Sequence, residues 1–271
     1  MSSEQHKIDR RDTVSLERES RTGFQGRIIP THRAIQQFDF PRRRLISVLL
    51  LPLIFTVLAW PALQFIGSAW AEFFIFWIEK LQLVASVSSS SYGPDWLKLS
   101  LPHLDIVAAP LQSALLWTGA AITLFMIVVS PFIPSKFLPL RYLVRVVAFI
   151  QTTALLFFFF VPERFPYSLA DHLESFQTTG VTLMLILPWV HALIYYIFDF
   201  SLFKKIFFTL LTLLFCSFLI PFMVVMHAYV VYSWSLLLVP LLYFVFGMFM
   251  LIIVCIALYG WAMSWRDSRV D

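Results

Sequence analysis

One polar stretch, residues 165–179, carries a compact group of ionisable side chains between two long apolar runs. Asp171, His172 and Glu174 lie within four consecutive positions. Carboxylates and imidazoles are the groups that bind metal ions and act as general acids and bases. His227, expected at the outer end of a later apolar run, could meet them. These four residues form a candidate site at which a ligand or a partner could dock.

A solvated loop between two membrane spans would have a similar composition. No HExxH motif and no paired-histidine spacing accompanies the group, so we expect no metal ion there. We therefore favour a docking surface for an external partner over a catalytic centre. An enzyme built on the four residues stays open as an alternative.

Gln151 and His191 form a second candidate, within the membrane. His191 is about 11 residues from the start of its apolar run and is therefore expected near the bilayer midplane. An ionisable group at that depth is energetically costly, which makes it a functional candidate by default. Gln151 is expected at a similar depth in the preceding run. A hydrogen bond between the two would hold neighbouring helices together. Alternatively, the pair could handle protons or a solute, with the helix break at Pro188 beside it.

Motifs typical of catalytic and nucleotide-binding sites are missing from the sequence. There is no P-loop, no GxSxG elbow and no glycine-rich dinucleotide turn. His191 and His227 differ in depth by most of half a bilayer, which argues against two axial ligands of one haem. We expect no cofactor and no nucleic-acid partner.

The composition indicates a membrane protein. Of 271 residues, 59% are hydrophobic and only 13% are charged, against about 25% charged in soluble domains. The two cysteines, Cys216 and Cys255, both lie in apolar runs. They are interpreted as small buried groups, because a disulfide framework or a zinc site would need more cysteines or other ligands at set spacings.

Six apolar runs reach the roughly 20 residues that a bilayer-spanning helix needs. They cover about residues 45–68, 111–132, 140–161, 180–198, 206–228 and 234–265. The sequence therefore predicts an all-α, polytopic transmembrane helix bundle of about six spans, with residues 45–265 as the membrane domain and both termini in the cytoplasm.

Two segments are expected on the outer face. Residues 69–110 begin with an amphipathic helix, which either lies in the interface or extends the first span. A serine-, glycine- and proline-rich stretch follows, for which we expect an irregular loop. Residues 162–179 are expected to form a loop and a short helix lying on the membrane, with Ser168 and Asp171 at the helix start.

The charge distribution gives the orientation. The cytoplasmic segments of this topology hold 17 of the 20 Lys and Arg, whereas the opposite loops hold three, against seven acids. The positive-inside rule then places the basic tail (residues 1–44) and the C-terminus (266–271) in the cytoplasm. Within the tail, Arg42, Arg43 and Arg44 form a basic patch suited to an anionic membrane surface.

We therefore expect a non-enzymatic multi-pass subunit or scaffold of a larger assembly in a bacterial inner membrane, of the secretion, conjugation or envelope-polymer kind. Its expected partners are the lipid bilayer and membrane or periplasmic proteins. A small-solute or ion transporter with a midplane site near His191 is one alternative. An outer-face enzyme using Asp171, His172, Glu174 and His227 is the other.

Overall fold

Six apolar helical segments dominate the structure. The computed structural model describes residues 42–93, 98–197 and 201–263, and in this part six segments are long and apolar enough to cross a membrane. The helical, six-span membrane fold is therefore confirmed. The predicted cytoplasmic termini, residues 1–41 and 264–271, lie outside the described residues. The backbone of Arg42, Arg43 and Arg44 begins the first helix, and their side chains also lie outside the description.

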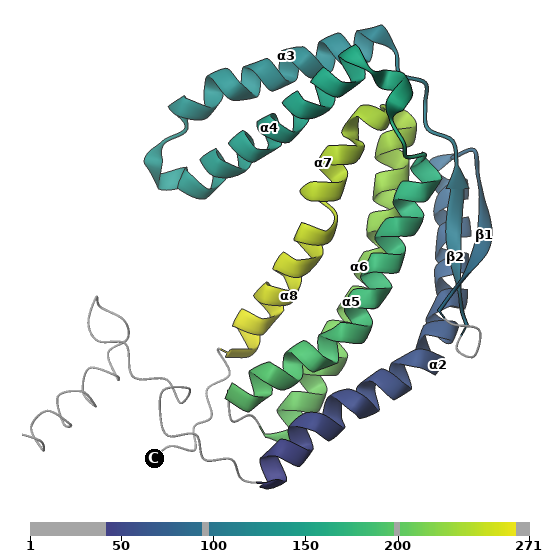
Figure 1. Cartoon of the computed structure of the whole chain (residues 1–271), viewed down its shortest axis with the longest axis vertical. Coiled ribbons are helices and arrows are strands. Elements are labelled where there is room, and N and C mark those ends of the chain that lie inside the picture. Colours follow the sequence, from purple (N-terminus) through teal and green to yellow (C-terminus); the bar gives the residue numbers. More distant parts are fainter. Residues whose placement is uncertain (1–41, 94–97, 198–200, 264–271) are drawn as a thin grey trace, which may run out of the picture.

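The first helix is about twice as long as a bilayer requires. Helix α2 (Arg42–Leu81) has 40 residues and so extends about 60 Å, against a hydrocarbon core of about 30 Å. Residues 69–81 therefore continue the helix of the first span and do not form a separate helix. In Figure 1, α2 runs beside α5 (Leu169–Ile197), which also packs against α6 (Leu202–Ser233).

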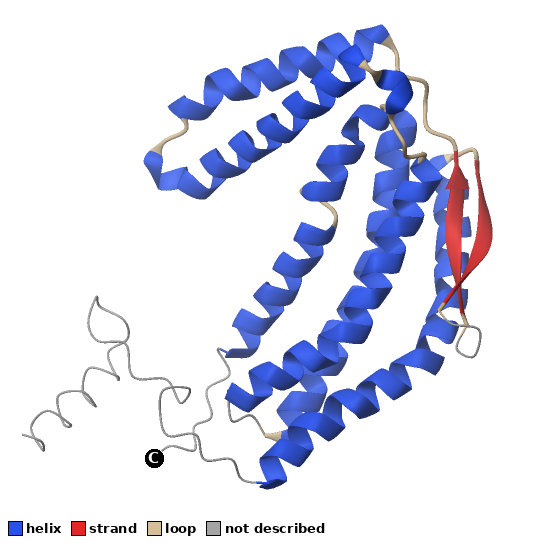
Figure 2. Ribbon diagram, in the orientation of Figure 1, coloured by secondary structure: helices blue, strands red, loops and turns tan. Residues whose placement is uncertain are grey.

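A β-hairpin replaces the irregular loop that we expected for residues 86–110. Strand β1 (Ala85–Tyr92) pairs antiparallel with β2 (Leu99–Ile106), and the two form the only sheet in the described part of the chain (Figure 2). The prediction was wrong because β2 carries apolar side chains that the neighbouring helices bury. These are Leu99, Leu101, Leu104 and Ile106. Strand β2 packs against both α2 and α5.

The main core lies where the hairpin meets the helices. Trp70 and Phe74 of α2, Leu173 and Phe176 of α5 and Ile220 of α6 are all buried in one cluster with the apolar side chains of β2. We call this end of the molecule the outer end. Burial of so many large side chains indicates that the outer end is held together like the interior of a soluble domain.

A proline in α6 explains one polar contact of this core. Pro221 has no N–H, so the carbonyl of Ser217, four residues earlier, lacks its helical partner. The indole N–H of Trp70 donates to that carbonyl at 2.7 Å. The hydrogen bond thus joins α2 to α6 at a position that the helix break leaves open.

Residues 162–179 do not form a separate helix on the membrane surface. A single 3₁₀ turn, η4 (Pro162–Arg164), precedes α5, which begins at Leu169 and continues without interruption past Gly180. The predicted helix start is confirmed: the Ser168 N–H and hydroxyl donate to Asp171 Oδ2 at 3.1 and 2.6 Å, and the Asp171 N–H donates to Ser168 Oγ at 3.1 Å. This is a capping box with aspartate in place of glutamate.

Two helices lean away from the others. Helices α3 (Ser113–Val129) and α4 (Leu138–Phe160), joined by the 3₁₀ turns η2 (Ser130–Phe132) and η3 (Ser135–Phe137), form what we call the arm (Figure 1). Helix α4 contacts the rest of the protein mainly at η5 (Leu236–Leu238) and α7 (Val239–Phe244). Most large apolar side chains of the arm remain exposed.

The predicted sixth span is not one helix. It consists of η5, α7, a turn at residues 245–247, and α8 (Met248–Met263). Gly247 lies in this turn, where only glycine fits. A Cβ atom at this position would be 2.5 Å from the carbonyl oxygen of Tyr243. A side chain at this position would force the backbone apart.

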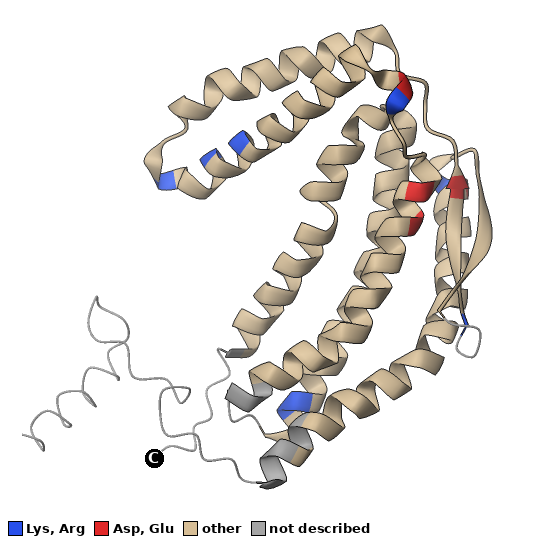
Figure 3. Cartoon of the chain, in the orientation of Figure 1, with Lys and Arg blue, Asp and Glu red and all other residues tan. Residues whose placement is uncertain are grey.

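The described charges are segregated along the molecule. Figure 3 shows Lys and Arg at the free end of the arm and near the start of α6, and Asp and Glu where α5 begins and beside the hairpin. Two basic residues, Lys80 at the end of α2 and Arg164 in η4, also lie at the outer end. Applied to this distribution, the positive-inside rule predicts that α5 begins on the outer side.

Candidate functional site

The structure brings two of the four outer-face residues together. His172 of α5 and His227 of α6 are both buried, with 4% and 0% of their surfaces exposed. The Nε2 of His172 lies 3.3 Å from the Nδ1 of His227, and the rings stack at an angle of 16° with their centroids 5.4 Å apart. The sequence had placed these histidines 55 positions apart on separate runs, and the antiparallel packing of α5 and α6 joins them.

The turn between α7 and α8 supplies the next contact. His227 Nε2 lies 3.3 Å from the carbonyl oxygen of Phe246. That carbonyl is available because the helix is interrupted at residues 245–247. Sequence reasoning missed this contact, although Gly247 in an otherwise bulky apolar run was a signal of a break.

The two carboxylates point to other partners. Asp171 caps α5 through Ser168, and Glu174 Oε1 accepts a hydrogen bond from the Tyr92 hydroxyl at 2.8 Å. Burial raises the pKa of Tyr92, so the phenol stays protonated and keeps donating to Glu174 at neutral pH. Glu174 therefore fastens the hairpin to α5, and the four predicted residues do not form a single cluster.

His103 belongs to strand β2 of the hairpin. Its two ring nitrogens lie 2.9 Å from Ser88 Oγ and 3.1 Å from Ser90 Oγ. Both serines are on the facing strand. His103 thus contributes to cross-strand bonding.

A cavity of about 470 Å³ opens beside His172. It lies between the beginning of α5 and α7. The cavity is lined by Phe165, Tyr167, Asp171, His172, Ser175, Val239, Pro240, Tyr243 and Phe244. Four of these side chains are Phe or Tyr, and Asp171 is the only Asp, Glu, Lys or Arg among them. We call this space the outer cavity.

The predicted pairing of His191 with Gln151 is wrong. His191 Nδ1 lies 3.3 Å from Thr209 Oγ1, and its ring packs against Phe208 with the centroids 4.6 Å apart. Gln151 lies in α4, which leans away from α5 as part of the arm. Gln151 and His191 were expected at a similar depth in the membrane. The depth of a residue does not determine which helices pack together, so the two residues are not neighbours.

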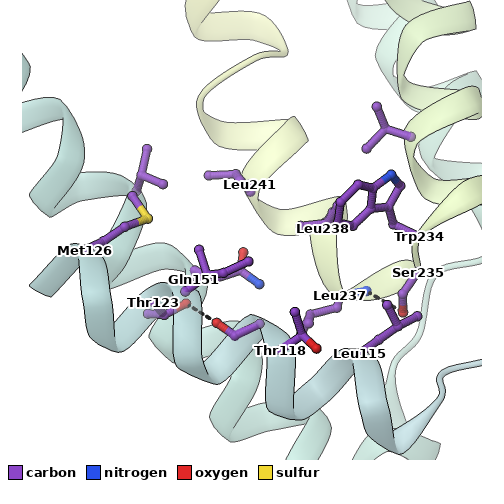
Figure 4. Close-up of a pocket in the computed structure, with 14 residues that line it drawn as sticks. Leu115, Thr118, Thr123, Met126, Gln151, Trp234, Ser235, Leu237, Leu238 and Leu241 are labelled. Atoms are coloured by element: carbon purple, nitrogen blue, oxygen red, sulfur yellow. Dashed lines mark hydrogen bonds between the residues drawn. The ribbon is translucent and has the colours of Figure 1, made fainter.

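Gln151 instead lines a cavity of about 390 Å³ between the arm and the segment that contains η5 and α7. In Figure 4 its side chain lies between Thr123 and Met126 of α3 and Leu238 and Leu241 on the other side. We call this space the arm cavity. Apolar side chains make up most of its lining.

The amide oxygen of Gln151 has no donor in the described part of the chain. Gln151 is only 6% exposed, and its Oε1 is buried without a hydrogen-bond partner. The hydroxyls of Thr118 and Thr123, which also line the cavity, donate to the carbonyls of Ala114 and Gly119 in their own helix. Neither hydroxyl therefore supplies a donor to Gln151.

Among the residues that the structure describes, no group of three or more His, Cys, Asp or Glu is placed to hold a metal ion. Cys216 of α6 and Cys255 of α8 are free thiols, and their Sγ atoms are 4.0 Å apart.

Comparisons with protein families, with curated proteins and with solved structures find no match for this chain.

Proposed function

We propose that this chain is a non-enzymatic multi-pass subunit of a larger assembly in a bacterial inner membrane, and that the arm receives a transmembrane helix of a partner protein. The observation that carries the proposal is the buried, unpartnered amide oxygen of Gln151 in the arm cavity. An amide buried without a hydrogen bond is unfavourable by about 1 to 3 kcal/mol.

A lipid acyl chain could fill the apolar part of the arm cavity, but it has no group that donates to Gln151. A transmembrane helix with a Ser, Thr, Asn or Gln side chain at this level offers both an apolar surface and a donor. Polar side chains of this kind commonly join helices in membranes. A protein partner therefore accounts for both features of the cavity.

The exposure of the arm supports the same proposal. Trp117, Phe125, Phe149 and Phe159 are each more than 60% exposed. Helices α5 and α6 leave far less of their surface uncovered, whereas α2 and α8 are about as uncovered as α3 and α4. A continuous exposed apolar surface of this kind is typical of a site that contacts lipid or another protein.

Site-directed photo-crosslinking in native membranes tests the proposal. A photoreactive phenylalanine analogue replaces Met126, which lines the arm cavity, or Leu193, an exposed apolar position on α5 that serves as the matched control. We expect a covalent protein adduct from position 126 and none from position 193. Lipid adducts alone at both positions would contradict a protein partner at the arm.

A further inference from the structure

The hydrogen bonds of the two buried histidines run in one direction. The Phe246 carbonyl can only accept, so His227 must carry its proton on Nε2. Neutral His227 then has a lone pair on Nδ1, and this atom can only accept. His172 must therefore donate from Nε2.

This direction determines the state of the remaining nitrogen. Neutral His172 with a proton on Nε2 has a lone pair on Nδ1. In the described part of the chain, Nε2 takes part in the hydrogen bond of His172 to His227, and Nδ1 has no such partner. The Phe246 carbonyl, in the turn after α7, thus makes Nδ1 of His172 an acceptor, and His172 is one of the residues that line the outer cavity.

The second acceptor is the carboxylate of Asp171. Its Oδ2 accepts from Ser168, and its Oδ1 makes no hydrogen bond within the described residues. Asp171 is exposed and lines the same cavity. A lone pair and a negative charge on residues that line one cavity favour a ligand group that carries several N–H donors and a positive charge.

The other walls suit the same group. Phe165, Tyr167, Tyr243 and Phe244 surround the cavity, and aromatic faces attract ammonium ions. Tyr167 and Phe244 are 60% exposed at its rim, so an apolar chain attached to the ammonium group can continue outward along them.

We propose that the outer cavity binds a primary ammonium group on an apolar body, as found in the headgroup of an ethanolamine lipid or in a free long-chain amine. The N–H groups donate to His172 Nδ1 and to Asp171, and the aromatic side chains surround the charge. A quaternary ammonium group has no N–H. It can contact the aromatic side chains, but it cannot donate a hydrogen bond to His172 or to Asp171. The inference does not depend on a protein partner at the arm.

Native mass spectrometry of the full-length protein in detergent tests the inference. Phosphatidylethanolamine and phosphatidylcholine with identical acyl chains are added at equal concentration. We expect retention of the ethanolamine lipid to exceed that of the choline lipid by about tenfold or more, since charge-assisted hydrogen bonds distinguish them. Equal retention of the two lipids, together with equal binding of dodecylamine and dodecyltrimethylammonium, would overturn the proposal.

The two amines also identify the source of the ligand. Selective binding of dodecylamine without selectivity between the lipids would support the same chemistry with a free amine as the ligand. Displacement of phosphatidylethanolamine by dodecylamine would support the lipid headgroup. Both comparisons use the unaltered protein, so they do not require a variant that folds.

Two variants separate the cavity from its surroundings. Asp171→Asn removes the charge that lines the cavity, whereas Glu174→Gln removes the same charge one turn further along α5, where Glu174 contacts Tyr92. We expect Asp171→Asn to lower the selectivity about tenfold and Glu174→Gln to leave it unchanged. Equal losses in both variants would contradict a specific role for Asp171.

Nitrogen-15 NMR of labelled histidine reports the acceptor directly. We expect His172 Nδ1 to be unprotonated at neutral pH and its resonance to move on addition of dodecylamine, while His227 changes less. A protonated His172 Nδ1 would overturn the assignment of the acceptor.

Discussion

At the scale of single residues, His191 is explained by its contacts with Thr209 and Phe208. His191→Gln keeps a donor and an acceptor, so we expect it to be nearly silent. His191→Leu removes the hydrogen bond and should lower the free energy of unfolding in detergent by about 0.6 to 2 kcal/mol. Loss of a transport activity in a stable His191→Gln protein would instead indicate proton or ion handling.

The contact between Trp70 and the carbonyl of Ser217 makes a second prediction at this scale. Trp70→Phe removes the indole N–H and should lower the free energy of unfolding by about 1 kcal/mol, beyond the loss of packing. In a Pro221→Ala background the helix regains its own donor to Ser217, so the same substitution should be less harmful. A double-mutant cycle measures this coupling. Additive effects would show that the hydrogen bond is not linked to the proline.

At the scale of elements, the turn between α7 and α8 positions the histidine pair. Gly247→Ala brings a Cβ atom against the Tyr243 carbonyl, and we expect it to lower the free energy of unfolding by about 1 to 3 kcal/mol and to weaken the contact of Phe246 with His227. Gly260→Ala is the matched control, because a Cβ atom there meets nothing within 4 Å. Equal thermal unfolding of the two variants would contradict this role of the turn.

The elements also show what the sequence could predict. Six long apolar runs were enough to predict six spans, and Ser168 with Asp171 was enough to predict the start of α5. The hairpin could not be recognised, since its apolar strand β2 is buried against α2 and α5, and α5 lies far along the chain. Depth along a span suggested Gln151 and His191 as partners, but depth says nothing about which helices are neighbours.

At the scale of the whole molecule, the positive-inside rule applied to the charged residues (Figure 3) predicts the topology. Reporter fusions after Arg141 and Lys205 should read cytoplasmic, and fusions near Tyr92 and Asp171 should read external. A cytoplasmic signal at Asp171 would place the outer cavity on the wrong side for this topology.

The central claim, that this membrane protein works as part of an assembly joined through the arm, is tested most directly by its size in native membranes. After extraction in mild detergent, the wild-type chain of 31.5 kDa should migrate as a larger complex with partner proteins identified by mass spectrometry. Gln151→Leu should release the partners without lowering the thermal stability of the chain itself, because it replaces an unpartnered polar group by an apolar one of similar size. A wild-type chain that runs alone, or a Gln151→Leu chain that keeps every partner, would contradict the account.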